Sequence, residues 1–123
     1  MRMIIIALIN NTFSRSKAMK KLLLAVLCLP ALGFAADAEY QLTLKDHRFS
    51  PAEIQVPAGK KLKLVVLNQD STPEEFESHS LNREKVIPGN ARGIIYVGPL
   101  AAGKYEFFGE FHEASARGAL VAQ

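Results

Sequence analysis

Residues 49–70, FSPAEIQVPAGKKLKLVVLNQD, carry the clearest structural signal in the sequence. Its first half predicts a strand, AEIQVPAG (52–59), that ends in a Pro-Ala-Gly turn, and its second half predicts the strongest strand, KKLKLVVLNQD (60–70). One face of this second strand carries Leu62, Leu64, Val66 and Asn68. A period of two is typical of a half-buried strand and excludes an amphipathic helix over these residues.

The same signals extend in both directions from this stretch. Further strands are predicted for YQLTLKD (40–46), EEFES (74–78), ARGIIYVGPL (91–100), GKYEFFG (103–109) and GALVAQ (118–123). Proline and glycine turns separate them at short spacing, and residues 78–86 are the one irregular or possibly helical segment. About seven short strands of this kind indicate an all-β domain over residues 38–123, a β-sandwich with Greek-key connections.

The N-terminal residues have the composition of a secretory leader. Residues 19–35 combine a basic start, an apolar run and small residues at the cleavage positions, so they predict a signal peptide. Its apolar run is too short to span a bilayer. Residues 1–18 fit no part of this scheme; we interpret them as the product of an upstream start codon chosen in error, with an additional apolar leader as the alternative. The expected location is the periplasm, with no membrane span after cleavage.

Charge and cysteine usage restrict the function of the exported part. The chain has 15 basic and 12 acidic residues, and five of the basic residues and none of the acids lie in residues 1–35. The remainder therefore has 10 basic and 12 acidic residues and a net charge near −2, which argues against nucleic acid as a partner. The single cysteine, Cys28, lies in the leader. The domain itself can form neither a disulfide nor a zinc–thiolate cluster.

Two motifs, one in each half of the domain, resemble the cupredoxin family. Residues 49–70 follow its opening pattern of a strand pair that leads into an apolar strand ending in Asn, and residues 103–118 follow its closing loop. The matching residues are Phe49, Pro51, Ile54, Val56, Gly59, Asn68, Gly103, Tyr105, Phe107, His112 and Gly118. The resemblance covers essentially all of residues 38–123 and implies a cupredoxin-like sandwich with a metal site at one end.

The resemblance breaks at the copper ligands. A type-1 blue-copper site needs two His, one Cys and a weak axial Met. In this frame Glu75 lies nearest the upstream His position, Gly109 replaces the Cys and Ala116 replaces the Met, while His112 is retained. Without a thiolate there is no blue-copper centre, which excludes a type-1 copper electron carrier.

Carboxylates crowd the two segments that should meet at the site. Glu75 and Glu77 share one face of a strand, and Glu110 and Glu113 flank His112. Carboxylates with an imidazole suit iron, manganese or Cu(II) better than Cu(I), and clustered like charges favour a bound cation. We therefore predict an iron or copper ion. The predicted metal residues, including one taken from the likeness described next, are Glu75, Glu77, Glu84, Glu110, His112 and Glu113.

A narrower likeness concerns bacterial iron uptake. The chain is similar to the EfeO-type periplasmic cupredoxin-like domains, which show an E-[WF]-E strand, here residues 75–77, and a charged segment that ends in Pro-Gly, here residues 83–89. This likeness alone implies a role for Glu84. It also implies a function as an accessory of iron uptake, with or without oxidation of the ion, beside an inner-membrane iron permease or a periplasmic iron-binding protein.

Other interpretations stay open at this point. The acids could form a solvated face that docks a basic partner, which would make the chain a non-metal interaction module. Glu74 is expected to be a solvated neighbour, His47 and His79 are expected to be loop residues outside the ligand set, and Arg83 is expected to pair with the acids. The phenylalanines, Phe111 among them, are expected to pack in the core or the site wall. The sequence contains no H-E-x-x-H motif, no G-x-S-x-G motif and no Gly-rich phosphate loop between a strand and a helix.

Overall fold

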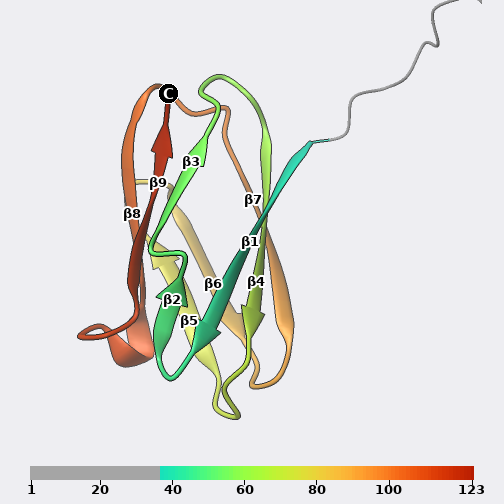
Figure 1. Ribbon diagram of the computed structural model, residues 1–123, viewed down its shortest axis with the longest axis vertical. Coiled ribbons are helices and arrows are strands. Elements are labelled where there is room, and N and C mark those ends of the chain that lie inside the picture. Colours follow the sequence, from blue (N-terminus) through green and yellow to red (C-terminus); the bar gives the residue numbers. More distant parts are fainter. Residues whose placement is uncertain (1–36) are drawn as a thin grey trace, which may run out of the picture. The chain divides into compact units, whose positions relative to one another are not determined.

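The computed structural model describes residues 37–123, which form two packed β-sheets (Figure 1). The strands are β1 (Ala38–Lys45), β2 (Arg48–Ser50), β3 (Glu53–Val56), β4 (Leu62–Asn68), β5 (Glu74–Ser78), β6 (Arg83–Ile87), β7 (Arg92–Val97), β8 (Gly103–Gly109) and β9 (Arg117–Ala122), with one 3₁₀ helix, η1 (Glu110–His112). The expected leader and signal peptide lie outside the described residues. Residues 37–123 contain no helix that is long and apolar enough to cross a membrane.

The first sheet has the strand order β2-β1-β4-β7 and the second has the order β3-β9-β8-β5-β6. β1 runs parallel to β4, and β3 runs parallel to β9, while the other pairs are antiparallel. The predicted alternation of β4 is confirmed, because Leu62, Leu64, Val66 and Asn68 are all buried. The inner faces of the two sheets enclose the core, where the rings of Phe49, Phe76 and Phe107 contact one another. The predicted all-β sandwich is confirmed.

Two short strands account for the difference between the expected seven and the observed nine. The predicted strand 40–46 ends at Lys45, because Asp46 and His47 adopt positive φ angles of 51° and 56°. Two consecutive left-handed residues make a tight hairpin turn, and the chain returns as β2. The segment expected to be irregular contains β6, a strand at the edge of its sheet. Its charged, exposed residues hide the strand signal, as is common at sheet edges.

Three segments meet at the end of the sandwich that lies opposite the C-terminus (Figure 1). They are the β1–β2 turn, the beginning of β5 and η1. Asn68 joins the loop between β4 and β5 to the end of β6: its amide nitrogen donates to the carbonyls of Thr72, Ile87 and Pro88 at 2.9–3.2 Å, and its oxygen accepts from the Asp70 N–H. This buried side chain fixes the loop that leads into β5.

Candidate metal centre

The loop from residue 109 to residue 116 closes on itself and holds His112. The Gly109 N–H donates to the carbonyl of Ala116 at 2.8 Å, and the Ala116 N–H donates to the carbonyl of His112 at 2.9 Å. The His112 side chain is 31% exposed, so it lies at the boundary between the sandwich and solvent.

Glu74 lies beside His112 and is one of the most buried side chains of the described residues, with 2% exposure. It begins β5 in phase with Phe76, and period two directs both side chains towards the core. Its Oε1 accepts from the N–H groups of Phe111 at 2.8 Å and Glu75 at 3.1 Å, while its Oε2 lies 2.5 Å from Nδ1 of His112. The expectation of a solvated Glu74 is wrong, because the alternation that buries Phe76 also buries Glu74.

Gly109 leaves the space that the Glu74 carboxylate occupies. A Cβ atom at position 109 would lie 2.6 Å from Cδ of Glu74 and 2.8 Å from its Oε1. The same Cβ would lie 2.8 Å from Cβ of Ala116. The glycine at the family's cysteine position and the buried glutamate are therefore linked: the carboxylate fills the volume that a side chain at 109 would need.

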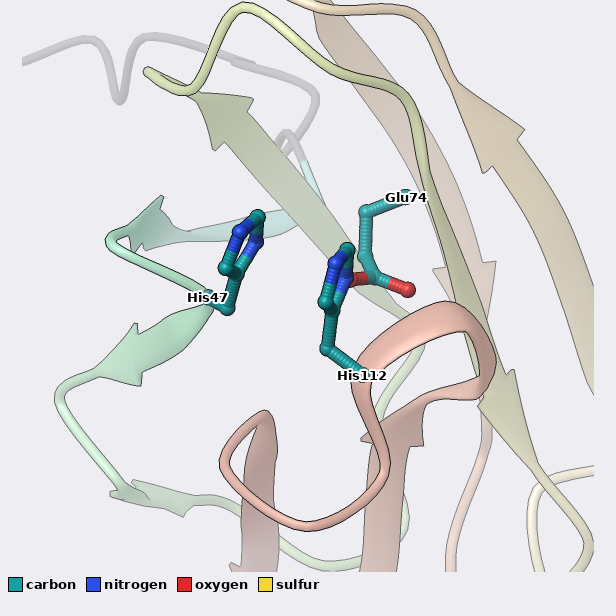
Figure 2. A group of neighbouring side chains, drawn as sticks. All are labelled: His47, Glu74 and His112. Carbon is teal, nitrogen blue, oxygen red and sulfur yellow. The ribbon is translucent and has the colours of Figure 1, made fainter.

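His47 reaches the site from the β1–β2 turn. The carboxylate of Asp70 accepts from the N–H groups of Asp46 at 2.8 Å and His47 at 3.0 Å, which fixes this turn. These bonds, the one from His47 first, lower the pKa of Asp70, and the nearby imidazoles of His47 and His112 act in the same direction. The His47 and His112 rings stack with centroids 3.5 Å apart (Figure 2).

Nδ1 of His47 is buried and has no hydrogen-bond partner among the described residues. It lies 3.4 Å from Oδ2 of Asp70, within the distance of an ion pair but without the geometry of a hydrogen bond. A buried ring nitrogen without a partner is uncommon, because its desolvation is uncompensated. It is a free ligand position within the site.

His47, Glu74 and His112 together form what we call the histidine–carboxylate group (Figure 2). Each offers one ligand atom, and these atoms lie within 4.8 Å of one another. Ligands of one ion at about 2.1 Å each lie at most about 4.2 Å apart, so small side-chain adjustments suffice for a common ion. The group contains two imidazoles and one carboxylate and no sulfur.

Glu75, Glu77 and Glu110 form a second cluster, the acidic group, whose ligand atoms also lie within 4.8 Å of one another. Glu84 lies opposite Glu77 on the neighbouring strand β6. Hydrogen bonding to Glu84, burial and the charge of Glu110 raise the pKa of Glu75 to about 7. Glu110 is the main cause that raises the pKa of Glu77. The acidic group thus contains carboxylates that disfavour one another's ionisation.

The structure divides the predicted site residues between two places. Glu75, Glu77 and Glu110 come together with Glu84 beside them, whereas His112 belongs to the histidine–carboxylate group. Glu113 is exposed and lies in neither group. Glu74, instead of the expected Glu75, is the β5 glutamate that contacts His112.

Two further expectations are corrected. Arg83 does not pair with the acids: its guanidinium donates to the carbonyls of Tyr96 and Asn82, both at 2.8 Å. Phe111 is 49% exposed and packs in neither the core nor the site wall. His79 lies on the surface, and its Nδ1 is 3.6 Å from Oε1 of Glu77.

Sequence reasoning missed the roles of Glu74 and His47, although a signal existed for each. Glu74 is two residues before the apolar Phe76 on a predicted strand, which indicates an inward direction. His47 is the second residue of an Asp-His pair between two strand-like runs, the length of a tight hairpin turn.

Comparisons with known proteins agree with this architecture. The family model described as "Cupredoxin-like domain" matches residues 4–122. A protein of Rickettsia prowazekii (strain Madrid E), named as uncharacterized, is 45% identical over 83 residues, which span 68% of this chain and 66% of the relative. The match thus covers slightly less than two thirds of that relative.

Solved structures share the fold at low sequence identity. Auracyanin A, titled a "blue" copper protein from Chloroflexus aurantiacus, has a TM-score of 0.62 at 15% identity, with coverage of 72% of this chain and 100% of its own. The metal-binding domain of the Cu(I)-exporting P-type ATPase of Streptococcus pneumoniae D39 has a TM-score of 0.62 at 14% identity, with coverage of 74% of this chain and 91% of its own. Amicyanin from Paracoccus versutus has a TM-score of 0.56 at 17% identity, with coverage of 77% of this chain and 90% of its own. These likenesses show the fold.

Proposed function

This chain belongs to the cupredoxin-like domain family, and on that premise we propose that it is an exported protein that binds a transition-metal ion through His47, Glu74 and His112. Two observations on His47 carry this proposal: its buried Nδ1 has no hydrogen-bond partner in the described residues, and one of its ring nitrogens lies within 4.8 Å of ligand atoms of Glu74 and His112. An ion would satisfy that nitrogen, which no side chain of the site does.

The donor set suits a first-row transition metal in a divalent state. Two imidazoles and one carboxylate match the preferences of Cu(II) and Fe(II), and the absence of sulfur from residues 37–123 disfavours Cu(I). By the general order of divalent affinities, Cu(II) should bind more tightly than Fe(II) at the same ligands. A bound ion of either kind would supply one-electron redox chemistry.

The surroundings of the three side chains leave the ion open to solvent on one side. The His47 and His112 side chains are 40% and 31% exposed, whereas Glu74 is buried and held by two backbone N–H groups. Glu74 and His112 would each offer a ligand atom to the ion, in place of the hydrogen bond that now joins Oε2 and Nδ1. Three protein ligands with a solvent-facing side leave room for water or a substrate ligand.

Calorimetric titration of the purified protein with Cu(II), and with Fe(II) under anaerobic conditions, tests the site. We expect one ion per chain, with Cu(II) tighter, and a loss of at least about tenfold in affinity for the His47→Ala, His112→Ala double variant. Wild-type affinity in this variant would refute the assignment. A thermal melt adds a second readout: an ion that binds only the folded chain raises the midpoint, while no shift favours the non-metal interaction module.

For the biological role, we propose an accessory of iron uptake that passes the ion to an inner-membrane iron permease or a periplasmic iron-binding protein, with or without its oxidation. The support is the likeness of residues 75–77 and 83–89 to the EfeO-type domains. Deletion of the gene should slow growth under iron limitation, and the wild-type gene should restore growth while the His47→Ala, His112→Ala gene should not. Equal rescue by both genes would show that the role in iron uptake does not require His47 and His112.

A further inference from the structure

We propose that the outer side of the first sheet, which we call the basic face, is a docking surface for an anionic lipid membrane. The strand order of this sheet is β2-β1-β4-β7 (Figure 1). Leu42, Leu64 and Ile95 of these strands are buried in the core, so strand alternation directs the residues next to them to the outer side. The proposal goes beyond metal binding, because the basic face contains no side chain of the histidine–carboxylate group.

The centre of the basic face is apolar. Outer positions of a β-sandwich normally carry polar residues that alternate with the buried ones. The outer positions here include Val65 and Leu67 on β4 and Ile94 and Tyr96 on β7, and Val65 lies directly opposite Ile94. Tyr96 is 49% exposed, and Leu67 and Ile94 are half-buried. An exposed apolar patch bordered by polar residues is typical of an interaction surface.

Basic side chains border this apolar centre. They are Lys45, Arg48, Lys61, Lys63 and Arg92. Lys63 lies opposite Tyr96 in the sheet, and Nζ of Lys61 lies 5.8 Å from the centroid of the Tyr96 ring. The one acid on these four strands is Glu39, which pairs with Lys63 at 3.1 Å. Within residues 37–123 the other four cations form no ion pair, so their charge is available to a partner.

The second sheet has the opposite charge. The outward positions of its strands carry five acids and two basic residues, Lys104 and Arg117. Arg83 and Lys85 of β6 add to the basic side instead, because they donate to backbone carbonyls of β7. A negatively charged surface would therefore attract the first sheet and repel the second, which gives the domain one preferred orientation.

Two features favour a lipid surface over an acidic protein as the partner. An exposed aromatic ring among Lys and Arg side chains is the combination found at membrane interfaces, where the ring lies at headgroup level and the cations contact lipid phosphates. The cations are also spread over four strands. Lipid headgroups can move to each of these charges, whereas a folded acidic protein offers carboxylates at fixed positions. The basic face lies along the side of the sandwich, so docking would leave the histidine–carboxylate group at its end uncovered (Figure 1).

Co-sedimentation of the purified protein with vesicles tests the proposal. We expect binding to vesicles of phosphatidylglycerol and phosphatidylcholine in equal parts, weaker binding as the salt concentration rises, and no binding to phosphatidylcholine alone. The Lys61→Gln, Arg92→Gln variant should bind at least about tenfold more weakly, because each basic residue near an anionic surface contributes about fivefold. The matched control, Lys104→Gln, Arg117→Gln, removes the same charge from the second sheet and should bind nearly like the wild type.

Three outcomes would overturn the proposal. The wild type could fail to bind the anionic vesicles, or the two double variants could lose binding equally, which would show an effect of net charge alone. Retention of the wild type on poly-glutamate beads but not on vesicles would show that the partner is an acidic protein. Thermal melts check that each variant is folded. Both double variants should bind Cu(II) like the wild type, so failure of the basic face and failure of the metal site are distinguishable.

Discussion

The two faces of β5 place neighbouring glutamates in opposite environments. Glu74 faces inward, where two backbone N–H groups and the His112 imidazole surround its carboxylate. Glu75 faces outward, where the nearest polar groups are other carboxylates. A one-residue step along the strand therefore moves a carboxyl group from among hydrogen-bond donors to among other carboxyl groups.

Burial alone therefore does not identify a metal ligand. Burial of Glu74 does not require an ion, because hydrogen-bond partners already surround its carboxylate. The outer acids repel one another, and protonation relieves that repulsion. Substitutions on the two faces should therefore differ in their effects on stability.

The largest effect is expected for Glu74→Ala. The change leaves the N–H groups of Phe111 and Glu75 without their acceptor and opens a void beside Gly109, so we expect a loss of about 3 kcal/mol in the free energy of unfolding. Cu(II) binding should also be lost. Urea unfolding and calorimetry measure both. Glu75→Ala is the comparison, and an equal loss of stability there would break the contrast between the two faces.

Gly109→Ala should come next, although residue 109 offers no ligand. The new Cβ would overlap the Glu74 carboxylate, so we expect a loss of about 1–3 kcal/mol in unfolding free energy and weaker Cu(II) binding. In a Glu74→Ala background the same change should cost less, because the carboxylate is gone. Additive effects in this double-mutant cycle would show that the two positions are not linked.

Asp70→Ala removes the acceptor that fixes the β1–β2 turn. Loss of two hydrogen bonds to Asp46 and His47 should lower the unfolding free energy by about 1–2 kcal/mol and weaken Cu(II) binding about tenfold through misplacement of His47. Calorimetry measures the affinity, and an unchanged Cu(II) affinity would contradict a role of Asp70 in placing His47.

The smallest effect concerns pH and the outer face. The pKa of Glu75 is raised to about 7 in the folded chain from an ordinary value of 4.5. The folded chain therefore holds the proton of Glu75 more tightly than the unfolded chain does. The stability that this proton contributes is complete below about pH 4.5 and is lost as the pH rises through 7. In metal-free buffer, Glu75→Gln should therefore gain stability relative to the wild type between pH 5 and pH 8. Urea midpoints at both values measure this difference, and a constant difference would contradict it.

The strands of the core were predictable because their signal is local. The alternation in residues 62–68 and the predicted strands at 74–78 and 103–109 match β4, β5 and β8. β6 was not predictable in this way, because an edge strand with exposed Arg83, Glu84 and Lys85 lacks an apolar face. Its partner β5 decides its conformation.

The ligand types of the site are predictable from the residues alone: carboxylates and imidazoles in the domain, no thiolate, and His112 in the closing loop. The sequence also named Glu75, Glu77 and Glu110 together, and these three residues lie close to one another in the structure. The grouping of these ligands is visible only in the folded chain, where Glu74 and His47 join His112 and Glu75 and Glu77 belong to a separate cluster. Ligand grouping depends on the face of each strand and on contacts between segments that lie dozens of residues apart in the sequence. Two such contacts are the stacking of His47 on His112 and the packing of the Glu74 carboxylate against Gly109.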